Sequence, residues 1–193
     1  MTQGMRWRVI TLQVVMVFTL GGITGLLYWA NQFTTNQVRD ELVAQQIYFP
    51  GTDQIKAGGA LDPAEFPQEI RDYAGTQVDN GDKARVYAND FIGIHLTKVA
   101  NGQTYAQVSS ALQKDPKNTT LAAQKTTLFQ GEMLRSQLLQ AYAWWTMGVY
   151  AGYAAIGTAL ATLAVFGALV FEIFVALRRP VKVTARKEAI AAA

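Results

Sequence analysis

The sequence predicts an all-α membrane protein, in which two transmembrane helices flank a small helical extracytoplasmic domain. Residues 9–30 contain no charged side chain, and between Arg135 and Arg178 the only charged residue at neutral pH is Glu172. A spanning helix needs roughly 20 apolar residues, so both stretches are long enough. Backbone polar groups find no partners in lipid, which requires these stretches to be helical there. The charged segment between them is typical of a water-soluble domain.

Basic residues beside the two stretches predict the topology. Segments 1–8 and 178–193 carry seven basic residues against one acidic residue, whereas 31–142 carries ten basic and twelve acidic residues. Cationic flanks mark the side that stays in the cytoplasm, and two spans require both ends on one side. We therefore expect a plasma-membrane protein with both termini in the cytoplasm. The isoelectric point near 9.2 reflects these flanks and does not indicate nucleic-acid binding.

These observations divide the chain into five segments. We expect a cytoplasmic tail (1–8), a first transmembrane helix (9–30), an extracytoplasmic helical domain (31–142), a second transmembrane helix (143–177) and a basic cytoplasmic tail (178–193). A cleaved signal peptide is the alternative for the first span. Its apolar core is usually about 7–15 residues long and precedes a pair of small residues. The longer run here ends in Tyr-Trp-Ala-Asn, which favours an uncleaved anchor.

The middle segment shows helical patterns and no sustained strand alternation. We expect the first helix to continue over 34–47, a short helix over 63–73 and an amphipathic helix over 83–99. Thr104 and Gln107 form a candidate capping box for another short helix. The last helix begins at Asn118 or Thr119 and continues into the membrane for roughly 55 residues. The chain has no cysteine, so packing or a partner must hold the domain together.

The side chains that carry most enzyme chemistry are sparse. His95 is the only histidine, whereas metal sites built from side chains usually recruit several His or Cys ligands. Membrane haem of the b type needs an axial imidazole at membrane depth, and neither predicted span contains a histidine. A lone histidine on a helical apolar stripe indicates a packed, hydrogen-bonded residue. The carboxylates of the middle segment are interleaved with basic residues, as on a solvated surface. We therefore expect no catalytic residue, no metal and no cofactor, and we do not expect an enzyme.

Each predicted span contains two glycines four residues apart. Gly21 and Gly25 lie in the first span, and Gly148 and Gly152 lie in the second. Small residues at this spacing let helix backbones approach closely, which drives helix association in lipid. Two interpretations stay open: the spans pack on each other, or one small-residue face receives another protein.

Aromatic and basic side chains near the span ends are candidate interfacial anchors. They are Trp7, Trp29, Trp144, Trp145, Arg178 and Arg179. A ligand or quinone site at Trp144-Trp145 is the alternative for that pair. Glu172 lies near the inner boundary, and we expect it to snorkel to the interface or pair locally with Arg179; a proton-handling role is the alternative.

The chain resembles a group of small two-span membrane proteins from actinobacteria. The matching residues are Ala88, Ile92 and His95-Leu96, then Gly102, Thr104-Tyr105-Ala106, and finally Met133-Leu134-Arg135, Leu138-Leu139 and Ala141. Such proteins often carry the label "aromatic ring-opening dioxygenase". Ring-opening iron enzymes of the extradiol type use two histidines and one carboxylate, and this chain has one histidine. The resemblance therefore implies a bacterial membrane location without that chemistry.

The function we expect is that of a non-catalytic accessory or structural subunit of a larger plasma-membrane complex. An actinobacterial respiratory supercomplex is one candidate host, and the expected partners are other integral membrane subunits and lipid. The alternative is a free-standing envelope protein that binds a lipid or small ligand through its 31–142 domain.

Overall fold

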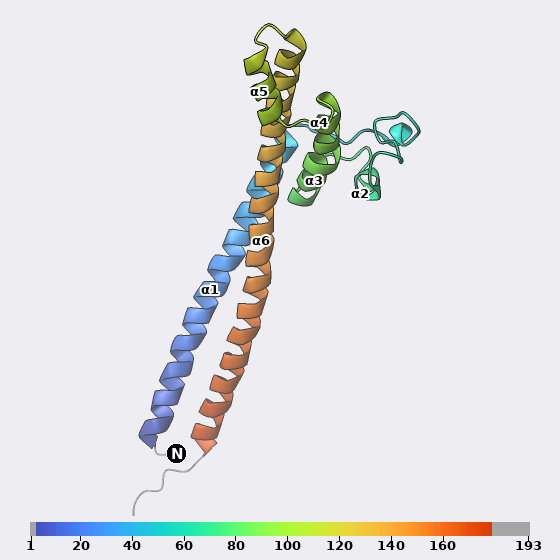
Figure 1. The fold of residues 1–193 in the computed structure, drawn as a ribbon. Coiled ribbons are helices and arrows are strands. Elements are labelled where there is room, and N and C mark those ends of the chain that lie inside the picture. Colours follow the sequence, from blue (N-terminus) through green and yellow to red (C-terminus); the bar gives the residue numbers. More distant parts are fainter. Residues whose placement is uncertain (1–2, 179–193) are drawn as a thin grey trace, which may run out of the picture. The chain divides into compact units, whose positions relative to one another are not determined.

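A computed structural model describes residues 3–178, and within them the chain is helical (Figure 1). Two long helices dominate: α1 spans Gln3–Ala44 and α6 spans Thr119–Arg178. Both are long and apolar enough to cross a membrane. Among the described residues no strand forms, and Tyr48 and Gln77 make only an isolated antiparallel bridge. The predictions of a helical chain and of two apolar helices of spanning length are confirmed.

Shorter helices connect α1 to α6. They are η1 (Thr52–Gln54), α2 (Gln68–Asp72), α3 (Gly81–Val86), η2 (Tyr87–Gly93), α4 (Ile94–Val99) and α5 (Tyr105–Lys114). The helix expected over 63–73 is shorter because Pro67 has an extended backbone and occupies the N-cap of α2. A residue before a proline also avoids the helical region. The last helix has 60 residues, close to the expected length.

Side-chain caps fix where α5 and α6 begin. The Thr104 hydroxyl accepts from the Gln107 backbone N–H at 3.4 Å, and the Gln107 carboxamide accepts from the Thr104 backbone N–H at 2.8 Å. This is the expected capping box. Asn118 Oδ1 accepts from the Leu121 N–H at 3.0 Å, which makes Asn118 the cap of α6 and Thr119 its first residue.

The chain divides into two compact units. Unit 1 comprises Met1–Tyr28 with Tyr153–Ala193, and unit 2 comprises Trp29–Gly152. Unit 2 contains the whole of the middle segment 31–142.

Unit 1 contains the first part of α1 and the last part of α6, which lie side by side (Figure 1). Half-buried or buried positions recur every three or four residues. On α1 they include Arg6, Ile10, Gln13, Val17, Leu20, Thr24 and Leu27; on α6 they include Ala155, Thr158, Thr162, Val165, Leu169 and Glu172. Alternating spacings of three and four define a coiled-coil seam. Contacts of Thr24 with Thr158, and of Arg6 with Glu172, make this pair antiparallel.

Unit 2 has a hydrophobic core drawn from almost every element. Sixteen buried residues form it: Val38, Leu42, Phe49, Leu61, Phe66, Ile70, Val78, Ala84, Val86, Ala88, Ile92, Leu96, Ala100, Val108, Leu128 and Leu138. Leu61, Ile70 and Val78 lie in or beside the irregular stretch between α1 and α3 and are fully buried. That stretch is therefore held by packing.

The helix expected over 83–99 is present as α3, η2 and α4 in succession, and η2 is a π-helix. Buried residues recur every four positions along it, at Ala84, Ala88, Ile92 and Leu96 and at the C-cap Ala100, and Val86 is buried as well. An α-helix turns ~100° per residue, so each step of four moves the buried face by ~40°, or ~160° over four steps. A π turn is wider and reduces that drift. The π segment thus keeps the side chains that are spaced four residues apart on the side of the helix that faces the core.

Candidate functional site

The two glycine pairs lie in different surroundings. A Cβ on Gly148 would lie 3.0 Å from Thr35 Cγ2 and 3.2 Å from Thr34 Cβ. A Cβ on Gly152 would lie 2.9 Å from Asn31 Nδ2, and that amide donates to the Gly148 carbonyl at 2.8 Å. The Gly148 and Gly152 face is therefore occupied by α1 within unit 2.

Gly21 and Gly25, by contrast, face open space. A Cβ at either position would meet nothing within 4 Å. Both glycines are exposed in unit 1, away from the seam that α1 makes with α6. Of the two interpretations of the glycine pairs, packing within the chain applies to Gly148 and Gly152, and an unoccupied face remains at Gly21 and Gly25.

Polar contacts in unit 1 lie along its seam. The Thr24 and Thr158 hydroxyl oxygens are 2.9 Å apart, and Arg6 Nε lies 3.5 Å from Glu172 Oε1. Glu172 therefore has a cationic partner on the other helix, which the sequence spacing did not reveal. The carboxamide oxygen of Gln13 is buried and has no hydrogen-bond partner among residues 3–178. In a coiled-coil seam, such polar positions select register and partner orientation.

The candidate anchors have different environments. Trp7 and Trp29 are well exposed, at 63% and 62%, and Trp29 stacks on Phe33 with ring centroids 5.3 Å apart. Trp144 is also exposed. Trp145 instead packs into unit 2, where its Cβ and Cγ fill the space beside Gly81. Arg178 ends α6, and Arg179 lies outside the described residues.

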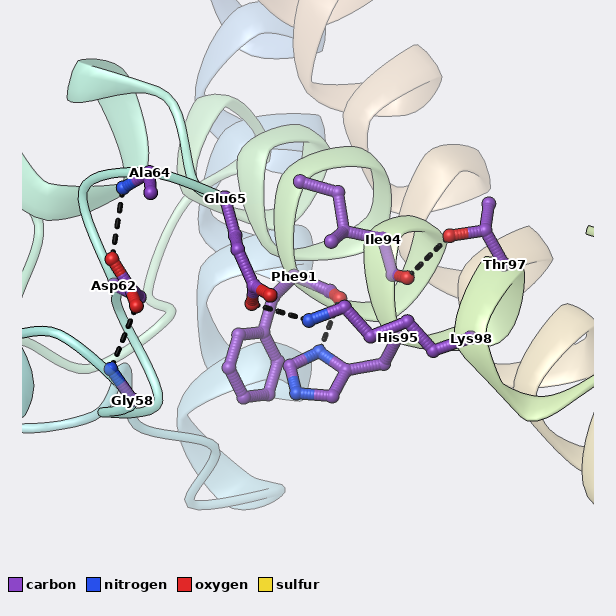
Figure 2. Close-up of polar contacts among 9 residues, drawn as sticks. All are labelled: Gly58, Asp62, Ala64, Glu65, Phe91, Ile94, His95, Thr97 and Lys98. Atoms are coloured by element: carbon purple, nitrogen blue, oxygen red, sulfur yellow. Dashed lines mark hydrogen bonds and ion pairs between the residues drawn. The ribbon is translucent and has the colours of Figure 1, made fainter. Parts of the chain in front are cut away.

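His95 is held by local packing (Figure 2). Its Nδ1 lies 2.8 Å from the Phe91 carbonyl oxygen, so Nδ1 carries the proton, because a carbonyl only accepts. The imidazole packs on the rings of Phe91 and Phe66, with centroids 4.5 Å and 5.5 Å away. Within residues 3–178 no group of three or more His, Cys, Asp or Glu side chains is arranged to hold a metal ion.

The pKa values of two carboxyl groups in unit 2 are shifted in opposite directions. The backbone N–H groups of Ala64 and Gly58 donate to Asp62 and lower its pKa below 3.8 (Figure 2). Burial raises the pKa of Asp90 above 3.8; nearby Glu69 raises this pKa further and Arg85 lowers it. Asp90 belongs to the π segment, so the wide turn carries a partly buried carboxyl group.

Arg135 connects α6 to the same π segment. One guanidinium nitrogen donates to Asn89 Oδ1 at 3.1 Å, and another donates to Glu132 at 3.4 Å. The third nitrogen, Nε, is buried and has no hydrogen-bond partner among residues 3–178. It faces Gly93, where a Cβ would lie 3.7 Å from it. This cation therefore fixes α6 against the π segment.

A groove of about 430 Å³ lies between α1 and α6 in unit 2. Its apolar lining residues are Phe33, Val38, Leu42, Leu138, Ala141 and Trp144; its polar ones are Thr34, Gln37, Glu41, Gln45, Gln137 and Gln140. Sequence reasoning missed this feature. Gln37, Glu41 and Gln45 recur every four residues beside Val38 and Leu42, a pattern that could have identified it.

No protein-family model, no curated protein and no solved structure matches this chain. The resemblance to two-span actinobacterial proteins therefore stays a prediction.

Proposed function

We propose that this protein is a non-catalytic accessory subunit of a larger membrane protein complex, anchored by α1 and α6. In this proposal both termini lie in the cytoplasm and most of unit 2 lies on the opposite side of a bacterial plasma membrane. Its partners are other integral membrane subunits and lipid. An actinobacterial respiratory supercomplex is one candidate host.

The observation that carries the proposal is the open face at Gly21 and Gly25. Within the described chain, nothing approaches a Cβ placed at either position. In lipid, helix association depends on close packing at small residues, because lipid tails are as apolar as the side chains. The other glycine pair already receives α1, whereas the Gly21 and Gly25 face stays available to another subunit.

The lack of burial in unit 1 supports membrane insertion. Phe18, Leu26 and Phe171 are 77%, 68% and 65% exposed. Soluble monomers rarely expose large contiguous apolar patches. A bilayer accommodates such a surface, and the basic residues at the chain ends favour the cytoplasmic side for both termini.

Single-cysteine variants test the topology, because the chain has no native cysteine. In intact cells, cysteines replacing Lys56 or Asn101 should react with an impermeant thiol reagent, and cysteines replacing Thr2 or Ala193 should not. Labelling of either terminal position from outside would contradict the proposed topology.

Partner retention tests the subunit role. Gly21→Leu with Gly25→Leu should still insert, because leucine favours lipid, but should no longer migrate with a larger complex on native electrophoresis after mild extraction. Loss of several close contacts at ~1–2 kcal/mol each would lower occupancy more than about tenfold. Mass spectrometry of the co-migrating species identifies the subunits that the variant loses.

A matched control is Val15→Leu with Thr19→Leu, which adds bulk to another exposed side of the same helix. This variant should keep the complex. If the wild-type chain migrates alone, or if the glycine variant keeps every partner, the subunit proposal is wrong and the envelope-protein alternative gains support.

A further inference from the structure

The groove of unit 2 has the size and lining of a ligand site. Its volume of about 430 Å³ falls within the range of roughly 300–1,000 Å³ that is typical of small-molecule pockets. Such pockets are mostly apolar, with a few polar groups that fix the orientation of the ligand. The groove has both parts, and they lie on two helices already packed through the core of unit 2.

The floor of the groove is apolar and already in place. Val38, Leu42 and Leu138 belong to the buried core of unit 2, so their positions do not depend on a ligand. The groove extends from Phe33 of α1 to Gln45, the residue after the helix, which at ~1.5 Å per residue corresponds to ~18 Å. An apolar chain can therefore lie lengthwise on this floor.

The edges of the groove are polar and mainly uncharged. The carboxamides of Gln37, Gln45, Gln137 and Gln140 offer both N–H donors and carbonyl acceptors. The one charged lining residue is Glu41, whose carboxylate accepts from Gln37 Nε2 at 3.0 Å. An anionic head group would approach this carboxylate unfavourably, whereas hydroxyl and ester groups suit the carboxamides.

One end of the groove adjoins the apolar part of α1. Phe33 and Trp144 line that end, and Phe33 stacks on Trp29 at 5.3 Å. The apolar run 9–30 ends at this point of the helix. Tryptophan side chains favour the level of the lipid head groups. The groove thus begins where the lipid surface would meet α1.

We propose that this groove binds the hydrocarbon chain of a lipid with an uncharged, hydroxyl-bearing head group, taken from the adjacent leaflet. The chain lies on Val38, Leu42 and Leu138, and the glutamine carboxamides hydrogen-bond to the head group. This inference rests on the proposed membrane insertion and on no particular partner subunit.

Photo-crosslinking in lipid nanodiscs tests the site. The full-length protein is reconstituted with a trace of diacylglycerol glucoside or, separately, phosphatidylglycerol, each with the same diazirine-bearing chain. After illumination, mass spectrometry should find the glucoside attached within 33–45 and 137–144, with much less attachment of the anionic lipid. Equal labelling by both lipids, or labelling that omits the groove, would overturn the proposal.

Three variants sharpen the result. Ala141→Phe fills the groove and should lower its labelling about tenfold, the loss expected when a chain gives up contact with about two methylene groups. Ala123→Phe makes the same change at an exposed position of α6 that does not line the groove, and it should leave the labelling unchanged. Gln140→Lys replaces an exposed residue at the edge and should shift the preference toward the anionic lipid.

The same mass spectra test the lipid site and the proposed membrane insertion separately. Labelling of residues 9–30 reports insertion of the span, whatever happens in the groove. If that span is labelled and the groove is not, only the lipid site is wrong; if neither is labelled, membrane insertion itself is wrong. Groove labelling that appears only after the chain is separated from its native complex would assign the groove to a partner helix and refute the lipid site.

Discussion

Units 1 and 2 use similar apolar side chains in opposite ways. In unit 2, Leu61, Ile70 and Val78 are completely buried, and sixteen residues share one core. In the described part of unit 1, the buried hydrophobic residues are Ala155 and Leu169, while Phe18 and Leu26 point outward. Burial from water stabilises unit 2. In the membrane that we propose for unit 1, the same force cannot hold its helices together.

The difference shows which contacts matter in each unit. In lipid, small residues, close packing and interhelical hydrogen bonds hold helices together. The seam of unit 1 contains a hydrogen bond between Thr24 and Thr158 and an ion pair between Arg6 and Glu172. In unit 2, polar contacts mainly cap helices and orient them around an apolar core. The two units should therefore respond differently to the same kind of substitution.

Truncation of a core side chain should give the largest difference between the units. Ile70→Ala should lower the free energy of unfolding of unit 2 by ~2–5 kcal/mol, because it removes a fully buried side chain and leaves a cavity. Ile156→Ala makes the same change in unit 1 at a side chain that is 62% exposed, and its effect should be small. Urea denaturation in micelles, followed by near-ultraviolet circular dichroism, measures both. Equal losses would remove the distinction between the units.

Adding bulk at Gly148 should have the next largest effect. Gly148→Leu would force Thr34 and Thr35 away, which at a packed site costs ~1–3 kcal/mol. Gly21→Leu enters open space and should leave the stability of the isolated chain unchanged. Thermal unfolding of the two purified variants gives the comparison. A larger loss for Gly21→Leu would show that this face is already occupied within the chain.

The pH dependence of unit 2 should have two opposing contributions, each smaller than the packing effects. The pKa of Asp90 is raised, so its folded form retains a proton more strongly, and stability falls as pH rises from 3.8 through the folded pKa. Asp90→Asn should therefore be more stable than the parent at neutral pH and show little gain below 3.8. Urea midpoints across this range measure the effect.

Asp62 supplies the control of opposite sign. The pKa of Asp62 is lowered, so its contribution to stability is present above 3.8 and is lost as pH falls through the folded pKa. Asp62→Asn should accordingly be less stable than the parent at neutral pH. Shifts in the same direction for both variants would contradict the assigned causes.

The hydroxyl contact of unit 1 should have the smallest effect. A double-mutant cycle of Thr24→Val and Thr158→Val should give a coupling energy of ~0.6 kcal/mol, the typical value for a hydrogen bond between membrane helices. Reversible unfolding in mixed micelles, followed by the separation of spectroscopic labels on α1 and α6, measures it. A coupling of several kcal/mol would mean that one polar contact dominates the seam.

Much of the fold could be predicted from local signals. Uncharged runs identified the two long helices, and Thr104 with Gln107 identified the start of α5. The limits of the middle unit and the π segment could not be predicted in this way. The limits of the middle unit depend on which side chains, distant in the sequence, pack into one core. The π segment depends on burial at every fourth residue, which can be recognised only when the core is known.

The candidate site was accessible from the sequence only in part. Gly21, Gly25, Gly148 and Gly152 were identified from spacing, but spacing cannot say which face of a helix meets a neighbour. Trp145 and Trp144 are adjacent in sequence, yet one packs beside Gly81 and the other lines the groove. The difference arises because consecutive helical residues point ~100° apart and meet different elements.

The sequence by itself determined that the chain is helical and that two of its helices contain apolar stretches of spanning length, because both properties depend on residues that are close together along the backbone. Tertiary structure alone decided that Gly148 and Gly152 receive α1 while Gly21 and Gly25 stay open, and that Glu172 pairs with Arg6. Those outcomes depend on the register of two helices whose contacting residues lie more than a hundred positions apart in the chain. That register is set by the sum of many weak contacts, so it cannot be inferred from any single residue in the sequence.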